Sequence, residues 1–139
     1  MDHQNMTSPC GLDCFNCPLY LAGRDEELRK NLAARLGVEA DKVVCRGCRN
    51  EGGKVAAIGR IRSCRIFQCV RDKKLNFCFE CGDFPCDHLH PYADQARLRP
   101  HNTKVFNLCL IRKMGLDRWA VEKAAKVKET YFNGTISLD

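Results

Sequence analysis

The chain has 139 residues, 11 of them cysteines, and a formal net charge of +6. The 45% apolar fraction includes these cysteines, so few aliphatic and aromatic side chains are left to stabilise a core without help. No apolar stretch is long enough to span a membrane, and the first ten residues lack the basic and apolar regions of a signal peptide. We therefore expect a cytoplasmic protein in a reducing compartment, where clustered cysteines are metal ligands more often than disulfides.

The N-terminal third combines cysteine motifs with a helical pattern. Residues 18–36 carry apolar side chains at helical spacing, Pro18 suits the first position of a helix, and Gly37 suits the position after its end. The pattern therefore predicts one continuous helix. Residues 39–44 are predicted to form a short helix or turn. A C-x3-C-x2-C motif precedes these predicted helices, and a C-x2-C motif follows them. Their cysteines are Cys10, Cys14 and Cys17 in the first motif and Cys45 and Cys48 in the second.

The middle third alternates loops and helices around further cysteines. Residues 50–60 contain three glycines and no periodicity, which predicts a loop. Residues 63–74 and 84–98 are predicted to be helical. Between them a second C-x2-C motif is followed by Gly82, where we expect a positive φ angle that points backbone amides at sulfur. The cysteines of this part are Cys64, Cys69, Cys78, Cys81 and Cys86.

The last third has one cysteine, Cys109, whose place on the apolar face of a predicted helix indicates a core thiol. Residues 102–114 and 116–132 show helical spacing and are separated by one glycine, which predicts an antiparallel pair. The expected fold is a mostly α-helical, small, cysteine-rich and metal-stabilised domain. Short helices joined by zinc knuckles would form a metal-binding region over residues 1–100, with a C-terminal helical hairpin over residues 101–139 packed on it as a single structural unit.

Ten cysteines stand at spacings typical of metal ligands, and Zn²⁺ in structural sites takes four such ligands in a tetrahedron. We therefore expect at least two structural zinc ions. One site is predicted from Cys14, Cys17, Cys45 and Cys48. The second is predicted from Cys64, Cys69, Cys78 and Cys81, with Cys10 and Cys86 as alternate or bridging ligands and His88 as a further candidate.

An iron–sulfur cluster is the alternative to zinc. Radical S-adenosylmethionine enzymes hold a four-iron cluster with the spacing C-x3-C-x2-C, and Cys17-Pro18 resembles the ending of ferredoxin motifs. A radical enzyme needs a barrel of roughly 200 residues or more, for which this chain has no room. A small iron–sulfur redox protein therefore stays open as an alternative function.

The sequence favours a non-enzymatic binding module over an enzyme. No H-E-x-x-H, G-x-S-x-G or dinucleotide-binding motif occurs, and zinc sites made only of cysteine are closed to substrates. Residues 46–74 contain nine basic and two acidic residues, a balance that favours nucleic acid or an acidic protein face as partner. The candidate anion-binding residues are Arg46, Arg49, Arg60, Arg62, Arg65, Lys73 and Lys74.

A simpler interpretation of the same segment stays open. Groups of thiolates attract cations, so the basic residues would serve to neutralise the metal sites. Phe77 and Phe79, which flank the second knuckle, are able to stack on bases but equally suit a place in the core.

Several segments are specific in combination: CGLDCFNCPLY at residues 10–20, CRGCR at 45–49, the pair Cys64 and Cys69, CFECGDFPC at 78–86 and GLDRW at 115–119. Together they resemble a family of small cysteine-rich bacterial and archaeal proteins that is catalogued only as a domain of unknown function. The resemblance covers about residues 8–120. It implies a prokaryotic, cytoplasmic, metal-binding protein and carries no established activity.

Overall fold

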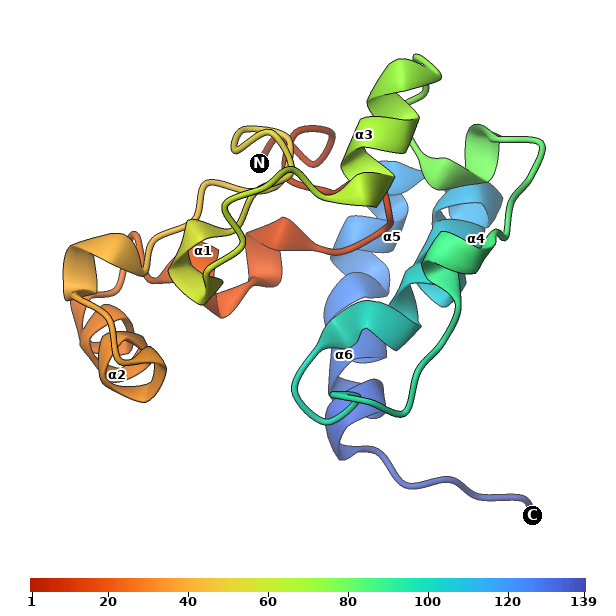
Figure 1. Ribbon diagram of the computed structural model, residues 1–139. Helices are drawn as coiled ribbons and strands as arrows, with labels where there is room; N and C mark the ends of the chain where they lie inside the picture. The colour runs from red at the N-terminus through yellow and green to blue at the C-terminus, as the bar shows by residue number, and fades with distance from the viewer.

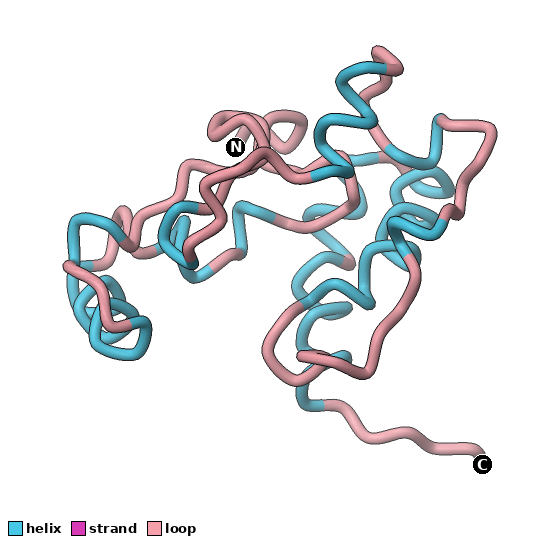
Figure 2. Tube along the Cα trace, in the orientation of Figure 1, coloured by secondary structure: helices cyan, strands magenta, loops and turns pink.

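The computed structural model describes residues 1–139 and is built of helices and loops (Figure 1). It contains no β-strand, only two isolated β-bridges, Thr7 with Asp13 and Val55 with Arg60 (Figure 2). The mostly α-helical class expected from the sequence is therefore confirmed. None of the helices combines the length and the apolar character needed to cross a membrane.

Six short α-helices are joined by loops that contain single 3-10 turns. The α-helices are α1 (Pro18–Leu21), α2 (Glu26–Leu36), α3 (Arg65–Asp72), α4 (Lys104–Met114), α5 (Leu116–Glu122) and α6 (Ala124–Asn133). The 3-10 turns are η1 (Cys14–Asn16), η2 (Ala40–Lys42), η3 (Ala56–Ile58), η4 (Cys78–Glu80), η5 (Asp87–Leu89) and η6 (Pro100–Thr103). In Figure 1, α1 and α2 lie on one side of the molecule and α4 to α6 on the other.

The continuous helix predicted over residues 18–36 is wrong at its centre, where the chain leaves α1 and starts again as α2. Asp25 has an extended backbone, and its carboxylate accepts a hydrogen bond from the Leu28 amide at 3.0 Å. This is an N-cap, which begins a new helix and does not continue the old one. The predicted end at Gly37 is confirmed. The break gives α1 and α2 a small core of their own: Ala22, Ala33 and Val43.

The helix predicted over residues 84–98 is also wrong, since this segment contains only the single turn η5. Two prolines explain the difference. The residue before a proline is pushed out of the helical region, and both His90 before Pro91 and Arg99 before Pro100 have ψ angles typical of extended backbone, 132° and 140°. The chain therefore reaches α4 through turns.

The C-terminal hairpin is present, with its second arm divided into two helices. The helix predicted over residues 116–132 is interrupted at Lys123, whose φ of −124° is not helical, and no helix-breaking residue marks this position. Near the end of α6, the Tyr131 hydroxyl accepts a hydrogen bond from the Asn102 side chain at 3.2 Å. The end of α6 thus lies beside the start of α4, and the arms are antiparallel as expected.

One main core joins the cysteine-rich part of the chain to this hairpin. The Trp119 side chain on α5 is fully buried, and its ring meets the Phe15 ring edge-on, with 6.1 Å between the centroids. The twelve buried core residues come from both parts: Met6, Cys10, Cys14, Phe15, Ile66, Phe77, Leu89, Leu108, Ile111, Trp119, Ala120 and Ala124.

Residues 7–13, here called the central loop, run against α4. The Ser8 hydroxyl accepts a hydrogen bond from the Leu12 amide at 2.8 Å, which holds the turn closed. Gly11 has a φ of +87°, and a Cβ atom there would lie 2.9 Å from Cγ of Leu108. Both the backbone conformation and the close approach to α4 therefore require glycine at this position.

Asn107 on α4 fixes the central loop to the hairpin. Its side chain is buried, donates to the Gly11 carbonyl at 3.0 Å and accepts from the Trp119 indole N–H at 3.2 Å. The Asn107 amide therefore provides a hydrogen-bond partner for one buried backbone carbonyl and one buried indole N–H, which belong to segments far apart in the sequence.

Replacing Asn107 with alanine is expected to lower the free energy of unfolding by about 2 to 6 kcal/mol. The substitution leaves a buried carbonyl and a buried N–H without partners, at about 1–3 kcal/mol each. Denaturant titration followed by circular dichroism measures the change. The control Asn31→Ala, on the exposed surface of α2, should be neutral or slightly stabilising because alanine favours helix. An Asn107→Ala variant as stable as this control would contradict the role of Asn107.

Candidate metal centres

Two knuckles meet beside α1. The Cys45 amide donates to the Leu19 carbonyl at 3.0 Å, which attaches the second knuckle to the start of this helix. Gly47, with a φ of +93°, lets the second knuckle turn tightly against Cys14 and places its own amide 3.4 Å from the Cys45 sulfur. The four cysteines brought together are called the N-terminal group: Cys14, Cys17, Cys45 and Cys48.

Most thiols of the N-terminal group are held in the protonated form. The Cys48 thiol donates a hydrogen bond to the Cys14 sulfur and lowers the pKa of Cys14 to about 7, while the same hydrogen bond raises the pKa of Cys48. Burial raises the pKa of Cys17 and Cys45. A metal that bound all four sulfurs would have to displace these protons, so its affinity would rise with pH.

A buried ion pair lies next to the N-terminal group. The Asp13 carboxylate is 3% exposed and lies 2.7 Å from the ammonium of Lys128, whose side chain is 27% exposed. Lys128 also donates to the Asn16 carbonyl at 3.4 Å, and its charge partly offsets that of the Asp13 carboxylate, which raises the pKa of Cys14. A cation from α6 therefore faces the first cysteine motif.

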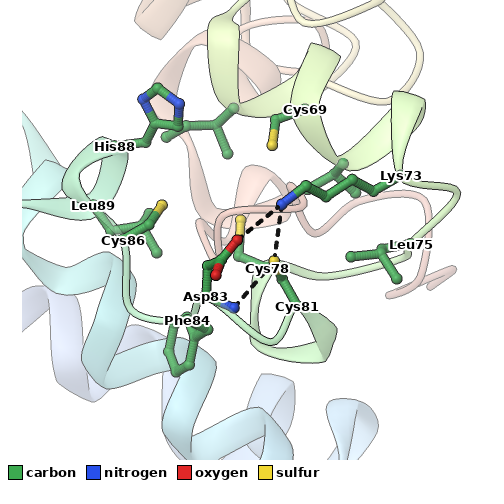
Figure 3. Close-up of a pocket in the computed structure, with 12 residues that line it drawn as sticks. Cys69, Lys73, Leu75, Cys78, Cys81, Asp83, Phe84, Cys86, His88 and Leu89 are labelled. Carbon is green, nitrogen blue, oxygen red and sulfur yellow. Dashed lines mark hydrogen bonds and ion pairs between the residues drawn. The ribbon is translucent and has the colours of Figure 1, made fainter.

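A second set of four cysteines lines a pocket of about 180 Å³ between α3 and the segment that follows it. Figure 3 shows Cys69, Cys78 and Cys86 around a common space, with Cys81 at its edge beside Lys73. The other walls are mainly apolar. These four cysteines are called the pocket group: Cys69 on α3, Cys78 at the start of η4, Cys81 just after η4, and Cys86 before η5.

Charge and burial act in opposite directions within the pocket group. The Asp83 amide, 3.5 Å from the Cys81 sulfur, and the Lys73 ammonium, 3.1 Å from it, lower the pKa of Cys81. Burial raises the pKa of Cys78 to about 12. The prediction of a positive φ at Gly82 is wrong. The Asp83 amide points at the Cys81 sulfur although Gly82 does not adopt that conformation.

The structure brings together three of the four residues predicted for the second site. Cys64 precedes α3, packs against the main core and does not line the pocket, where Cys86 is found in its place. Cys10 is buried on the central loop, 3.1 Å from the Ser8 hydroxyl, and lies near both Cys48 and Cys78. Cys109, on α4, belongs to neither group.

In both groups the thiols lie near one another but are not arranged as the ligands of one metal ion. No three cysteine, histidine, aspartate or glutamate side chains converge closely enough to hold a single metal ion. The donor set nevertheless has the chemistry of a metal site. Sulfur ligands alone suit zinc and iron–sulfur clusters, and backbone amides point at sulfur in both groups.

Lys104 is a buried cation near the pocket group that the motifs did not reveal. Its ammonium lies 3.1 Å from Nδ1 of His101, whose Nε2 lies 2.8 Å from the His90 carbonyl and donates to it. It makes no ion pair with a carboxylate, and its charge favours the thiolate form of Cys78. Helical spacing could have found it, because Lys104 shares one face of α4 with the buried Leu108.

Four of the basic residues predicted to bind anions are free to do so. Arg49 is not among them, because its guanidinium donates to the Thr7 carbonyl at 2.8 Å and the Asn76 carbonyl at 2.6 Å and lies over the ring of the buried Phe77. Arg46 pairs with Glu51, and Lys73 with Asp83. The exposed basic residues of this segment without an ion pair are Lys54, Arg60, Arg62, Arg65 and Lys74.

Replacing Lys128 with methionine is expected to lower the free energy of unfolding by about 2 to 3 kcal/mol, because it leaves the buried Asp13 carboxylate unpaired. This loss is no larger than the smallest losses for breaking a fully buried ion pair, about 3 kcal/mol, because Lys128 is partly exposed. Denaturant titration tests it, with Lys126→Met on the exposed surface of α6 as the matched control. Equal stability of the two variants would show that the ion pair contributes nothing.

Comparison with known proteins identifies a family. A family model described as "Protein of unknown function (DUF3795)" matches residues 6–91, more than half of the chain. The matched segment contains the central loop and both cysteine groups and ends before the helical hairpin. No curated protein and no solved structure matches the chain. The chain therefore belongs to the DUF3795 family of proteins of unknown function, as its cysteine motifs indicate.

Proposed function

We propose that both cysteine groups bind metal and that the fold stabilised in this way is a binding module. One observation carries the proposal: cysteines from separate motifs gather in two groups of four, with Lys128 and its partner Asp13 beside one group and Lys73 in contact with a sulfur of the other. Neutral core thiols have no need of neighbouring cations. Thiolates bound to a metal do, because a four-thiolate zinc site keeps a net charge of about −2.

For the N-terminal group we propose structural zinc. Four sulfurs from two knuckles would complete a tetrahedron and leave no position for a substrate, so the ion would stabilise the fold without taking part in catalysis. Zinc at the pocket group, the second of the two ions expected from the sequence, stays a prediction. An iron–sulfur cluster is the second candidate there, because the pocket group surrounds a cavity.

The partner we propose is nucleic acid, bound through the exposed basic residues of 54–74. Arg60 and Arg62 lie on a loop whose base is fixed by two hydrogen bonds of 2.8 Å. The Ser63 hydroxyl donates to the Gly52 carbonyl, and the Cys64 amide donates to the Gly53 carbonyl. Cations held in place in this way can meet a phosphate backbone without first being ordered. An acidic protein face is the other partner that this charge would suit.

Removing the metal is expected to unfold the protein. Metal binding of this kind supplies folding free energy, and little apolar surface is available to replace it. Protein purified without oxygen should contain metal at both groups, and a strong chelator under reducing conditions should abolish the helical circular dichroism signal. Elemental analysis and circular dichroism of the same sample measure both effects.

Two serine variants test which cysteines matter. Cys17→Ser should lose the zinc of the N-terminal group, whereas Cys109→Ser, outside both groups, should keep every ion. Wild-type protein that is folded and contains no metal at either group would disprove the proposal.

Binding to nucleic acid should weaken steeply with salt. If about five cations contact phosphates, the logarithm of affinity should fall against the logarithm of salt concentration with a slope of roughly −3.5 to −4.5. Replacing Arg60, Arg62 and Arg65 with alanine should flatten the slope by about two to three units. Fluorescence anisotropy with labelled single- and double-stranded oligonucleotides measures both.

The matched control removes the same charge from the helical hairpin: Lys113, Lys123 and Lys126 replaced by alanine, all exposed. Its slope should equal that of the wild type. No binding at about 50 mM salt would exclude nucleic acid and leave an acidic protein as partner.

A further inference from the structure

The pocket group differs from a zinc shell in the space that it encloses. Zinc with Zn–S bonds of about 2.3 Å brings its four sulfurs to about 3.8 Å from one another, around a single ion. The pocket lined by the four sulfurs has a volume of about 180 Å³, more than ten times the roughly 15 Å³ that suffices for one water molecule.

We infer that the pocket group holds a four-iron, four-sulfide cluster, with one iron bound by each of Cys69, Cys78, Cys81 and Cys86. The inference rests on the proposed function, which requires a metal at this group. A cluster of this kind is a compact body of eight atoms with its cysteine ligands on the outside. A ligand set for it therefore surrounds a cavity, as these four residues do (Figure 3), and does not converge on one point.

The walls of the pocket suit such a cluster. The inner walls are apolar, and such surroundings help to set the potential of an iron–sulfur centre, whereas Lys73 and Asp83 lie at the exposed edge of the pocket. The apolar lining residues are Ile66, Val70, Leu75, Phe84 and Leu89.

The charges around the pocket also suit a cluster with four thiolate ligands, whose net charge is negative. Lys73 places its ammonium 3.1 Å from the Cys81 sulfur, and the Asp83 amide points at the same sulfur from 3.5 Å. Hydrogen bonds and cations at the sulfurs stabilise a bound cluster and make it easier to reduce.

The experiment is anaerobic reconstitution of the full chain with ferrous iron and sulfide. The expected product contains about four iron atoms and four acid-labile sulfides per chain, and it has a broad visible absorption band. Dithionite should bleach this band by adding one electron to the cluster, which passes from its 2+ to its 1+ state. The zinc of the N-terminal group should remain.

Serine variants assign the ligands. Cys86→Ser and Cys69→Ser should each lose most of the iron and the visible band. Cys64→Ser, at the position that the sequence favoured over Cys86, should keep both, as should Cys109→Ser. Circular dichroism of each variant shows whether it has folded.

A second measurement does not depend on removing a ligand. Lys73→Met should keep the cluster and lower its midpoint potential, because a positive charge beside the cluster favours the reduced form. Lys74→Met, exposed and outside the pocket, should leave the potential unchanged.

The outcomes separate this inference from the proposed function. Zinc in both groups, with no iron after reconstitution, would overturn the cluster and keep the proposed function. Folded protein without any metal would overturn both. Iron that is lost in Cys64→Ser and retained in Cys86→Ser would overturn the assignment of the ligands.

Discussion

The backbone of the central loop holds the other parts of the molecule together. Its carbonyl groups at Thr7, Pro9 and Gly11 face outward, because the loop is neither helix nor strand and does not use them in regular structure. The donors come from three distant parts of the chain: Arg49 beside the second knuckle, the Cys78 backbone amide in the pocket group, and Asn107 on α4. The placement of both cysteine groups against the helical hairpin therefore depends on one short loop.

The hairpin also shapes the electrostatics of the cysteine groups. Lys104 on α4 faces the pocket group, and Lys128 on α6 faces the N-terminal group through Asp13. Burying the Lys104 ammonium, which pairs with no carboxylate, costs free energy unless negative charge lies nearby, whereas Lys128 is partly exposed and pairs with Asp13. A hairpin that packed only through apolar contacts would not need either lysine.

Local signals in the sequence predicted what is decided locally. The end of α2 at Gly37 follows from neighbouring residues, whereas the break at Lys123 has no local mark and depends on packing. The exchange of Cys64 for Cys86 has a geometric cause. Cys64 is the N-cap of α3, has an extended backbone and packs against the main core, whereas Cys69 lies on the helix and lines the pocket.

The ion pair between Asp13 and Lys128 extends across the boundary of the family. The acid lies within the segment that the family model matches, and the lysine lies in the hairpin beyond it. Loss of Lys128 leaves the buried Asp13 carboxylate without an ion pair, so a change at either position alters what the other position requires. Relatives whose hairpin has diverged are therefore expected to carry a different residue between the first cysteines of the motif, and the two positions should change jointly through the history of the family.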